Sequence, residues 1–250
     1  MTTSTPFLFL SARPEEDAVT PEYEAMLAAT GLGPTELLHH RLDVDALPPL
    51  PLDGFAGVIV GGSPYNITQL SERKSPTQLR VEHDLAKLAD WAVSTDFPVL
   101  FTCYGIGMLT QCQGGVVGTE FGEEAGPVTV TLTADGLADP LLAGLEPSFT
   151  ALVGHKEATS VLPASATLLA TSEACPVQIY RVGANVYATQ FHPEVLPLDF
   201  IARAHVYKEH GYFPAHELDE VAARLAASVV TEPPKIMTRF VERFTRRHAA

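Results

Sequence analysis

Three residues in this sequence have the side-chain types that nucleophilic catalysis needs, and each follows a predicted strand. Cys103 comes after the apolar segment PVLFT, while His192 and Glu194 come after NVYAT, within the segment QFHPE. A thiolate can attack a carbonyl carbon, an imidazole can move the proton, and a carboxylate can orient the imidazole. Residues i and i+2 of an extended segment share a side, so the imidazole and the carboxylate can face together. We predict that these three side chains meet in one site.

The residues around Cys103 predict a sharp turn between a strand and a helix. Gly105 lies two positions after Cys103, and Gly107 follows it in the predicted helix. A glycine beside a nucleophile leaves room for such a turn. A helix N-terminus and a neighbouring histidine both favour the thiolate form. The alternative is a buried cysteine that packs as a small apolar side chain.

A third strand end supplies backbone amides for the same site. Gly61 and Gly62 follow the β-branched segment GVIV. Their N–H groups, together with the amide of Tyr104, can point at a developing oxyanion. The alternatives are an ordinary tight turn at the glycines and a surface histidine beside a solvated glutamate in QFHPE.

The elements that must position these residues alternate along the first part of the chain. Apolar runs predict strands at 6–12, 36–42, 56–62 and 98–102, and helical spacing predicts helices near 21–30 and at 76–95. Such alternation is typical of a mostly parallel sheet covered on both faces. In doubly wound sheets of this kind, sites form at the carboxyl ends of the strands.

The texture changes after residue 127. Short strand candidates lie at 127–132, 166–171, 176–182 and 185–191, and part of the sheet there is expected to be antiparallel. Helices are predicted at 198–210, 215–230 and 234–248. No repeat or linker divides the chain. We therefore predict one domain over 1–250, with a core at about 5–195 and a C-terminal helical extension at about 197–250.

Composition restricts the classes of function. The formal net charge of −14 argues against a nucleic-acid or anionic-membrane surface, because phosphates need a basic partner. No signal segment or membrane span is visible, so a cytoplasmic protein is expected. Cys103, Cys112 and Cys175 contain no CxxC pair, which indicates neither a disulfide framework nor a metal site. No cofactor is expected.

The ordered segments VGGSP, PVLFTCYG and ATQFHPE resemble class I glutamine amidotransferase domains, especially stand-alone members similar to the glutaminase part of GMP synthase. The similarity extends from the first strand to about residue 195 and includes VGHKEA (153–158) and PVQIYRV (176–182). It implies an α/β fold: a flavodoxin-like three-layer sandwich with a mostly parallel central sheet, extra short antiparallel strands and C-terminal helices.

The resemblance also implies a role for each site residue. Cys103 would attack the side-chain amide of glutamine and form a γ-glutamyl thioester, ammonia would leave, and water would release glutamate. His192 would act as general base and acid, with Glu194 as its orienting partner. Gly62 and Tyr104 would supply the amides of the oxyanion hole.

Two positions depart from the family's usual G-x-C-x-G-x-[QEH] pattern. Phe101 stands where a glycine is usual, and Gly107 stands where a polar side chain helps to hold the substrate. Losing a buried hydrogen-bond partner costs about 1–3 kcal/mol of recognition. The remaining pocket is expected to involve Gly61, Gly105, Gly107 and His155.

Three functions therefore stay open. The first is a glutaminase, either acting alone or bound to a separate synthetase subunit; the chain has no GxxxxGK[ST] motif, and the part after Glu194 is too short for a second catalytic domain. The second is a γ-glutamyl hydrolase or peptidase that acts on an amide other than glutamine, an alternative that Gly107 favours. The third is a non-catalytic scaffold. The first two take a small-molecule substrate.

Overall fold

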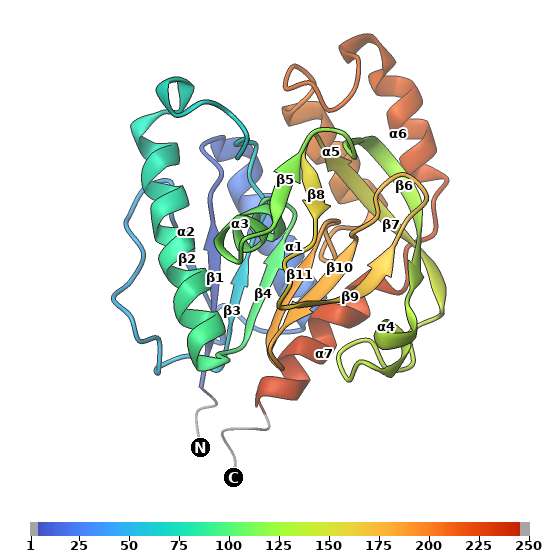
Figure 1. The fold of residues 1–250 in the computed structure, drawn as a ribbon. Coiled ribbons are helices and arrows are strands. Elements are labelled where there is room, and N and C mark those ends of the chain that lie inside the picture. Colours follow the sequence, from blue (N-terminus) through green and yellow to red (C-terminus); the bar gives the residue numbers. More distant parts are fainter. Residues whose placement is uncertain (1–4, 246–250) are drawn as a thin grey trace.

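A computed structural model describes residues 5–245 (Figure 1). Its main sheet has nine strands in the order β2-β1-β3-β4-β11-β10-β9-β6-β7. The first five strands in this order are parallel to one another. They are β1 (Phe7–Ser11), β2 (Leu37–Arg41), β3 (Val58–Val60), β4 (Val99–Thr102) and β11 (Val186–Thr189).

The other four strands of this sheet are antiparallel to their neighbours. They are β6 (Glu123–Leu132), β7 (Ser148–His155), β9 (Ala166–Thr171) and β10 (Ile179–Val182). A separate antiparallel pair joins β5 (Val116–Gly118) to β8 (Ala158–Val161). The predicted combination of a parallel sheet with antiparallel strands is confirmed. Strands β5, β7 and β8 were not predicted; β5 and β8 are short and partly exposed, so they lack a dense apolar run.

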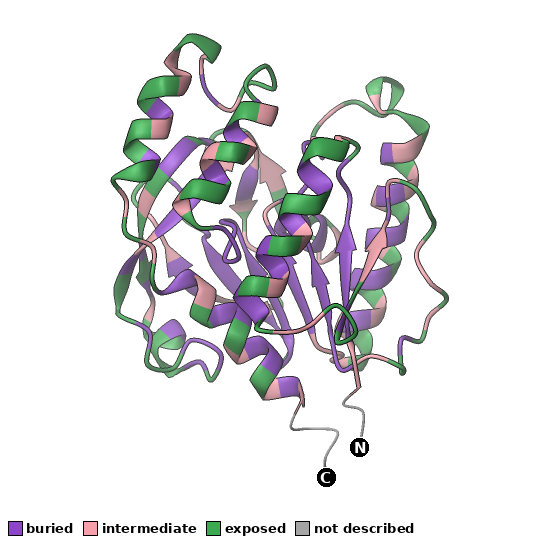
Figure 2. Cartoon of the chain, turned by 180° about the vertical axis from the view of Figure 1, so that it is seen from behind, coloured by how far each residue is buried: buried purple, intermediate pink, exposed green. Residues whose placement is uncertain are grey.

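Helices cover both faces of the sheet. They are α1 (Glu16–Thr30), α2 (Pro76–Thr95), α3 (Tyr104–Cys112), α4 (Ala134–Ala138), α5 (Pro197–Val206), α6 (Leu218–Ala226) and α7 (Pro233–Thr245). Side chains alternate along a strand, so Phe7 and Phe9 of β1 pack in the core beneath α1 and α7, whereas Leu8 and Leu10 pack beneath α2. Figure 2 shows the inner parallel strands as buried, as a sheet with two covered faces requires, whereas the edge strand β2 is partly exposed.

The helix boundaries differ from the predicted ones in three places. Helix α1 begins at Glu16, before the predicted 21–30, and keeps Pro21 inside it. The predicted helix 198–210 ends at Val206, and the predicted helix 215–230 becomes a 3₁₀ turn (Ala215–Glu217) followed by α6. The predicted helix 234–248 is observed as α7, and its last three positions lie outside the described residues.

The three strand ends chosen from the sequence lie beside one another. The register pairs Val60 of β3 with Phe101 of β4, and Thr102 of β4 with Thr189 of β11. Helices α5 and α6 pack together and add a third apolar cluster, which includes Ala125 and Phe200, beside this edge (Figure 1). Within residues 5–245, no helix combines the length and the apolar character that a membrane span needs.

Candidate active site

Cys103 occupies a sharp turn between β4 and α3. Its backbone has φ 49° and ψ −102°, a conformation that non-glycine residues rarely adopt. Its N–H donates to the carbonyl of Thr189 at 2.8 Å, and the Thr102 hydroxyl donates to the carbonyl of Val60 at 3.0 Å. Strained backbone of this kind persists only where surrounding contacts hold it, and it gathers at functional sites. The turn therefore resembles the nucleophile elbow of α/β hydrolases.

Phe101 fits this turn although a glycine is usual there. Its ring is buried in the core between the sheet and α2. A Cβ atom placed on Gly105 would lie 3.0 Å from the Phe101 Cβ. The bulky residue before Cys103 is thus accommodated by the glycine after it.

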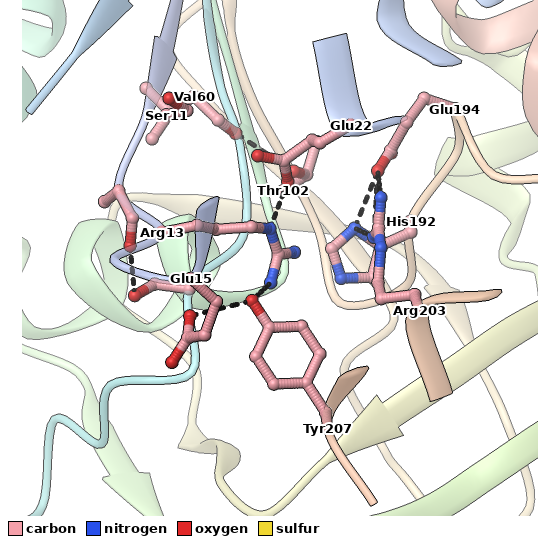
Figure 3. A network of polar contacts seen from close by, with 12 residues as sticks. Ser11, Arg13, Glu15, Glu22, Val60, Thr102, His192, Glu194, Arg203 and Tyr207 are labelled. Atoms are coloured by element: carbon pink, nitrogen blue, oxygen red, sulfur yellow. Dashed lines mark hydrogen bonds and ion pairs between the residues drawn. The ribbon is translucent and has the colours of Figure 1, made fainter. Parts of the chain in front are cut away.

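His192 and Glu194 form a buried pair after β11. The His192 Nδ1 lies 2.9 Å from the Glu194 Oε1, and the two residues are 5% and 2% exposed. Arg203 of α5 reaches the same carboxylate oxygen at 3.3 Å (Figure 3). A carboxylate at Nδ1 leaves Nε2 on the opposite side of the ring for chemistry.

Electrostatics favour a thiolate–imidazolium pair. Burial raises the pKa of the Cys103 thiol, but His192, together with the charges of Arg13 and Arg203, outweighs burial, so the net pKa is lowered. Burial lowers the pKa of His192, but Glu194 and Cys103 outweigh it and raise this pKa to about 9. Burial likewise opposes the charge of Glu194, yet His192 and Arg203 hold its pKa near 2.

The other two cysteines behave in the opposite way. Burial, with the charge of Asp90, raises the pKa of Cys112 to about 11. Burial also raises the pKa of Cys175 to about 12. At neutral pH both remain thiols.

Gly62 lies directly against the histidine. A Cβ atom at this position would lie 2.5 Å from the His192 Cε1 and 3.0 Å from the Arg13 Nη2, so a side chain does not fit. Among residues 5–245, the amides of Gly62 and Tyr104 have no hydrogen-bond acceptor. These are the two amides predicted for the oxyanion hole.

Two cavities meet at Cys103. The first, of about 390 Å³, is lined by Tyr104, Gly107, His155 and Gln190 among others. The second, of about 430 Å³, is lined by His192, Arg203 and Arg13 together with aromatic side chains. Both cavities are also lined by Ser63, Cys103, Gly154 and Tyr212.

Ile67 fills the space beside Gly107 in the first cavity. A Cβ atom on Gly107 would lie 2.5 Å from the Ile67 Cδ1. The Glu157 carboxylate holds this loop, accepting hydrogen bonds from the amides of Ile67 at 2.7 Å and of Thr68 at 3.0 Å. An apolar side chain thus occupies the place where the family's polar residue would begin.

Of the other residues predicted for the substrate pocket, only His155 lines a cavity. His155 lines the first cavity, but its ring lies between the Glu123 carboxylate, at 2.9 Å, and the Glu157 carbonyl, at 3.0 Å. Gly105 and Gly61 line neither cavity, and Gly61 packs against the Phe9 ring.

Sequence reasoning missed several residues of the site. Arg13 follows β1 and is buried, with its Nε 2.7 Å from Glu22; its place at a strand end is a signal that could have drawn attention to it. Arg203 and Tyr212 come from the C-terminal extension and carry no motif. Gln190 lines the first cavity, and its buried side-chain oxygen has no partner among the described residues.

Known proteins are similar to this chain in sequence and in fold. The family model for glutamine amidotransferase class-I matches residues 33–200. A glutamine-hydrolyzing GMP synthase from Thermomicrobium roseum is 31% identical over 139 residues, which are 56% of this chain and 23% of that protein. One of the subunits of the glutamine-hydrolyzing GMP synthase from Natronomonas pharaonis is 30% identical over 149 residues, 59% of this chain and 70% of the relative.

The fold agrees with these matches. A glutamine amidotransferase structure from Thermotoga maritima aligns with a TM-score of 0.72 at 20% identity, covering 97% of this chain and 99% of that one. The chain aligns with about a quarter of the length of the GMP synthases first matched. With the family model matching most of its length, the chain belongs to the class-I glutamine amidotransferases.

Proposed function

We propose that this chain hydrolyses the side-chain amide of glutamine, with Cys103 as the nucleophile. The observation that supports this most is the combination, at the adjoining ends of β4 and β11, of a thiol with a lowered pKa, a histidine held by a carboxylate, and adjoining cavities. The matched relatives whose names include glutamine hydrolysis support the substrate.

The reaction follows from the positions of the groups. The Cys103 thiolate attacks the amide carbon, and the developing oxyanion accepts hydrogen bonds from the amides of Gly62 and Tyr104. His192 then gives its Nε2 proton to the leaving nitrogen, ammonia departs, and a γ-glutamyl thioester remains. Water attacks the thioester as His192 takes its proton, which releases glutamate. Glu194 keeps the imidazole oriented and stabilises its charged form.

The first cavity is the proposed site for the amino-acid end of glutamine. It contains polar groups, among them Lys156, Glu157 and Gln190, around the apolar contact made by Ile67. The Gln190 side-chain oxygen is a proposed acceptor for the substrate ammonium, because it is buried without a partner.

A separate synthetase subunit is the proposed user of the ammonia. The support is the Natronomonas pharaonis relative, which is itself named as one of the subunits of GMP synthase.

Ammonia release from L-glutamine tests the proposed function. Purified chain should release ammonia and glutamate in equal amounts, and Cys103→Ser should abolish the release. Cys175→Ala is the matched control, since that thiol also lies beside a histidine–glutamate pair but lines neither cavity. Release that survives in Cys103→Ser would overturn the proposal.

A further inference from the structure

The two cavities at Cys103 present different groups to a bound substrate. The Tyr104 turn, Gly107 and His155 line the first cavity only, whereas His192 lines the second only. The thiol therefore lies between a cavity lined by the Tyr104 turn and a cavity lined by the proton donor His192.

This arrangement gives the scissile amide a direction. The leaving nitrogen must collect a proton from His192, so it has to point toward the second cavity. The acyl part then extends into the first cavity. Whatever is bonded to the leaving nitrogen lies in the second cavity during the attack.

The second cavity presents more than a site for ammonia. It opens beside the thiol and is lined by apolar and aromatic side chains as well as by Arg13 and Arg203. Its apolar wall comes from Phe200, Ala204 and Phe213, beside the aromatic rings of Tyr207 and Tyr212. This apolar wall fits an amine with an apolar side chain.

The same cavity holds a cation with a free donor. Arg13 is 3% exposed; its Nε donates to Glu22 at 2.7 Å and its Nη1 donates to the Tyr207 hydroxyl at 3.2 Å. Its Nη2 has no hydrogen-bond acceptor among the described residues and lies on the side of His192 (Figure 3). A guanidinium N–H that faces a partly apolar cavity is suited to a carboxylate.

We infer that the preferred substrate is a γ-glutamyl amino acid whose leaving amino acid has an apolar side chain, its carboxylate bound by Arg13 and its side chain packed between Phe200 and Phe213. This inference rests on the proposed function, because it uses the same nucleophile and the same acyl cavity. The new element is the group bonded to the leaving nitrogen.

The reaction balances with water alone. The Cys103 sulfur forms a bond to the γ-carbonyl carbon, the C–N bond breaks, and the His192 proton goes to the nitrogen of the departing amino acid. Water then adds to the thioester carbon, its proton passes to His192, and the C–S bond breaks. The products are glutamate and the free amino acid.

Three substrates test the inference without altering the protein. They are γ-glutamyl-leucine, L-glutamine, and the γ-glutamyl amide of 3-methylbutylamine, which is the leucine compound without its carboxylate. We expect kcat/KM for γ-glutamyl-leucine to exceed both others by about tenfold or more, since a charged hydrogen bond and a filled apolar cavity are each worth that much.

A matched pair of variants locates the effect. Ala204 is buried and lines the second cavity, whereas Ala202 is exposed on the same helix. Ala204→Phe should lower kcat/KM for γ-glutamyl-leucine about tenfold more than for glutamine, because the ring fills the cavity. Ala202→Phe should leave both values within about twofold.

The outcomes separate the two proposals. If no γ-glutamyl compound is cleaved in a Cys103-dependent way, the proposed function fails. If glutamine is cleaved but γ-glutamyl-leucine is not preferred, or if Ala204→Phe lowers both substrates equally, the inference about the second cavity is wrong while the proposed function stands.

Discussion

Two clusters in this protein contain a cysteine, a histidine and a glutamate, and they differ in nearly everything else. The first, here called the elbow cluster, is Cys103, His192 and Glu194. The second, the buried cluster, is Cys175, His155 and Glu123. Its sulfur, an imidazole nitrogen and a carboxylate oxygen lie within 4.8 Å of one another. Residue types alone therefore do not distinguish a candidate catalytic site from a structural network.

The buried cluster is organised around its carboxylate. Glu123 accepts hydrogen bonds from Gln178 at 2.7 Å and Ser172 at 3.2 Å and contacts His155 at 2.9 Å. The Cys175 thiol, wholly buried, donates to the Val177 carbonyl instead. Each of these groups already has a hydrogen-bond partner, and burial raises the pKa of the thiol to about 12, which keeps it neutral.

The elbow cluster is organised around its sulfur. The turn at Cys103 has a positive φ, the thiol opens on two cavities, and its pKa is lowered where that of Cys175 is raised. Backbone geometry, an adjoining cavity and the opposite direction of the cysteine pKa shift separate the two clusters.

Replacing the two cysteines in turn should give the largest difference in kcat between the clusters. Cys103→Ser should lower kcat for γ-glutamyl amide hydrolysis by about 10³-fold or more, because the nucleophile is lost. Cys175→Ala should stay within about threefold. Steady-state ammonia release measures both, and equal losses would show that the clusters are not functionally distinct.

The carboxylates should give the next largest difference. Glu194→Gln should lower kcat by about 10²-fold or more, because the imidazole loses its charged partner. Glu123→Gln should change kcat far less and instead reduce the free energy of unfolding by about 1–3 kcal/mol, since it disturbs a buried hydrogen-bond network. Denaturant unfolding measured beside kcat separates the two effects, and a reversed pattern would contradict this assignment.

The pH dependence should belong to the elbow cluster alone. The lowered pKa of Cys103 means that its thiolate forms at a lower pH than that of an ordinary thiol, and kcat/KM should fall about tenfold per unit once the pH drops below that pKa. The raised pKa of His192 predicts a second fall above pH 9, where the proton donor is lost. A profile that rises through pH 8 to a plateau near pH 11, as an ordinary thiol would give, is inconsistent with the ion pair.

The smallest effect is expected beside the elbow, at Gly107. Gly107→Gln alone should raise KM for glutamine, because its Cβ meets Ile67. With Ile67→Ala in the same chain, the added amide should lower KM up to about tenfold relative to Ile67→Ala alone. An unchanged KM in that comparison would mean that the first cavity holds its substrate by other groups.

The strands of the parallel half could be predicted from the sequence, because burial on both faces leaves dense apolar runs such as those of β3 and β4. The grouping of Cys103 with His192 could be predicted because both follow such strands. Strands β5 and β8 could not be predicted from the sequence, because Val116 and Val161 are about half exposed and the apolar pattern is weak.

The residues around the thiol were harder to predict. Arg203 and Tyr212 enter the site only because α5 and the segment after it fold over the strand ends, a tertiary contact without a local pattern. The Ile67 side chain occupies the space beside Gly107 because Glu157 holds the loop that contains Ile67. Glu157 lies ninety positions further along the chain, so no local pattern indicates this contact.

The most direct measurement is covalent labelling by a diazoketone analogue of glutamine, followed by intact mass and peptide mapping. Near neutral pH we predict a single adduct on Cys103, absent in Cys103→Ser and retained in Cys175→Ala. An adduct on Cys175 or Cys112, or an unlabelled Cys103 in folded protein, would contradict the assignment of the elbow cluster as the nucleophilic site.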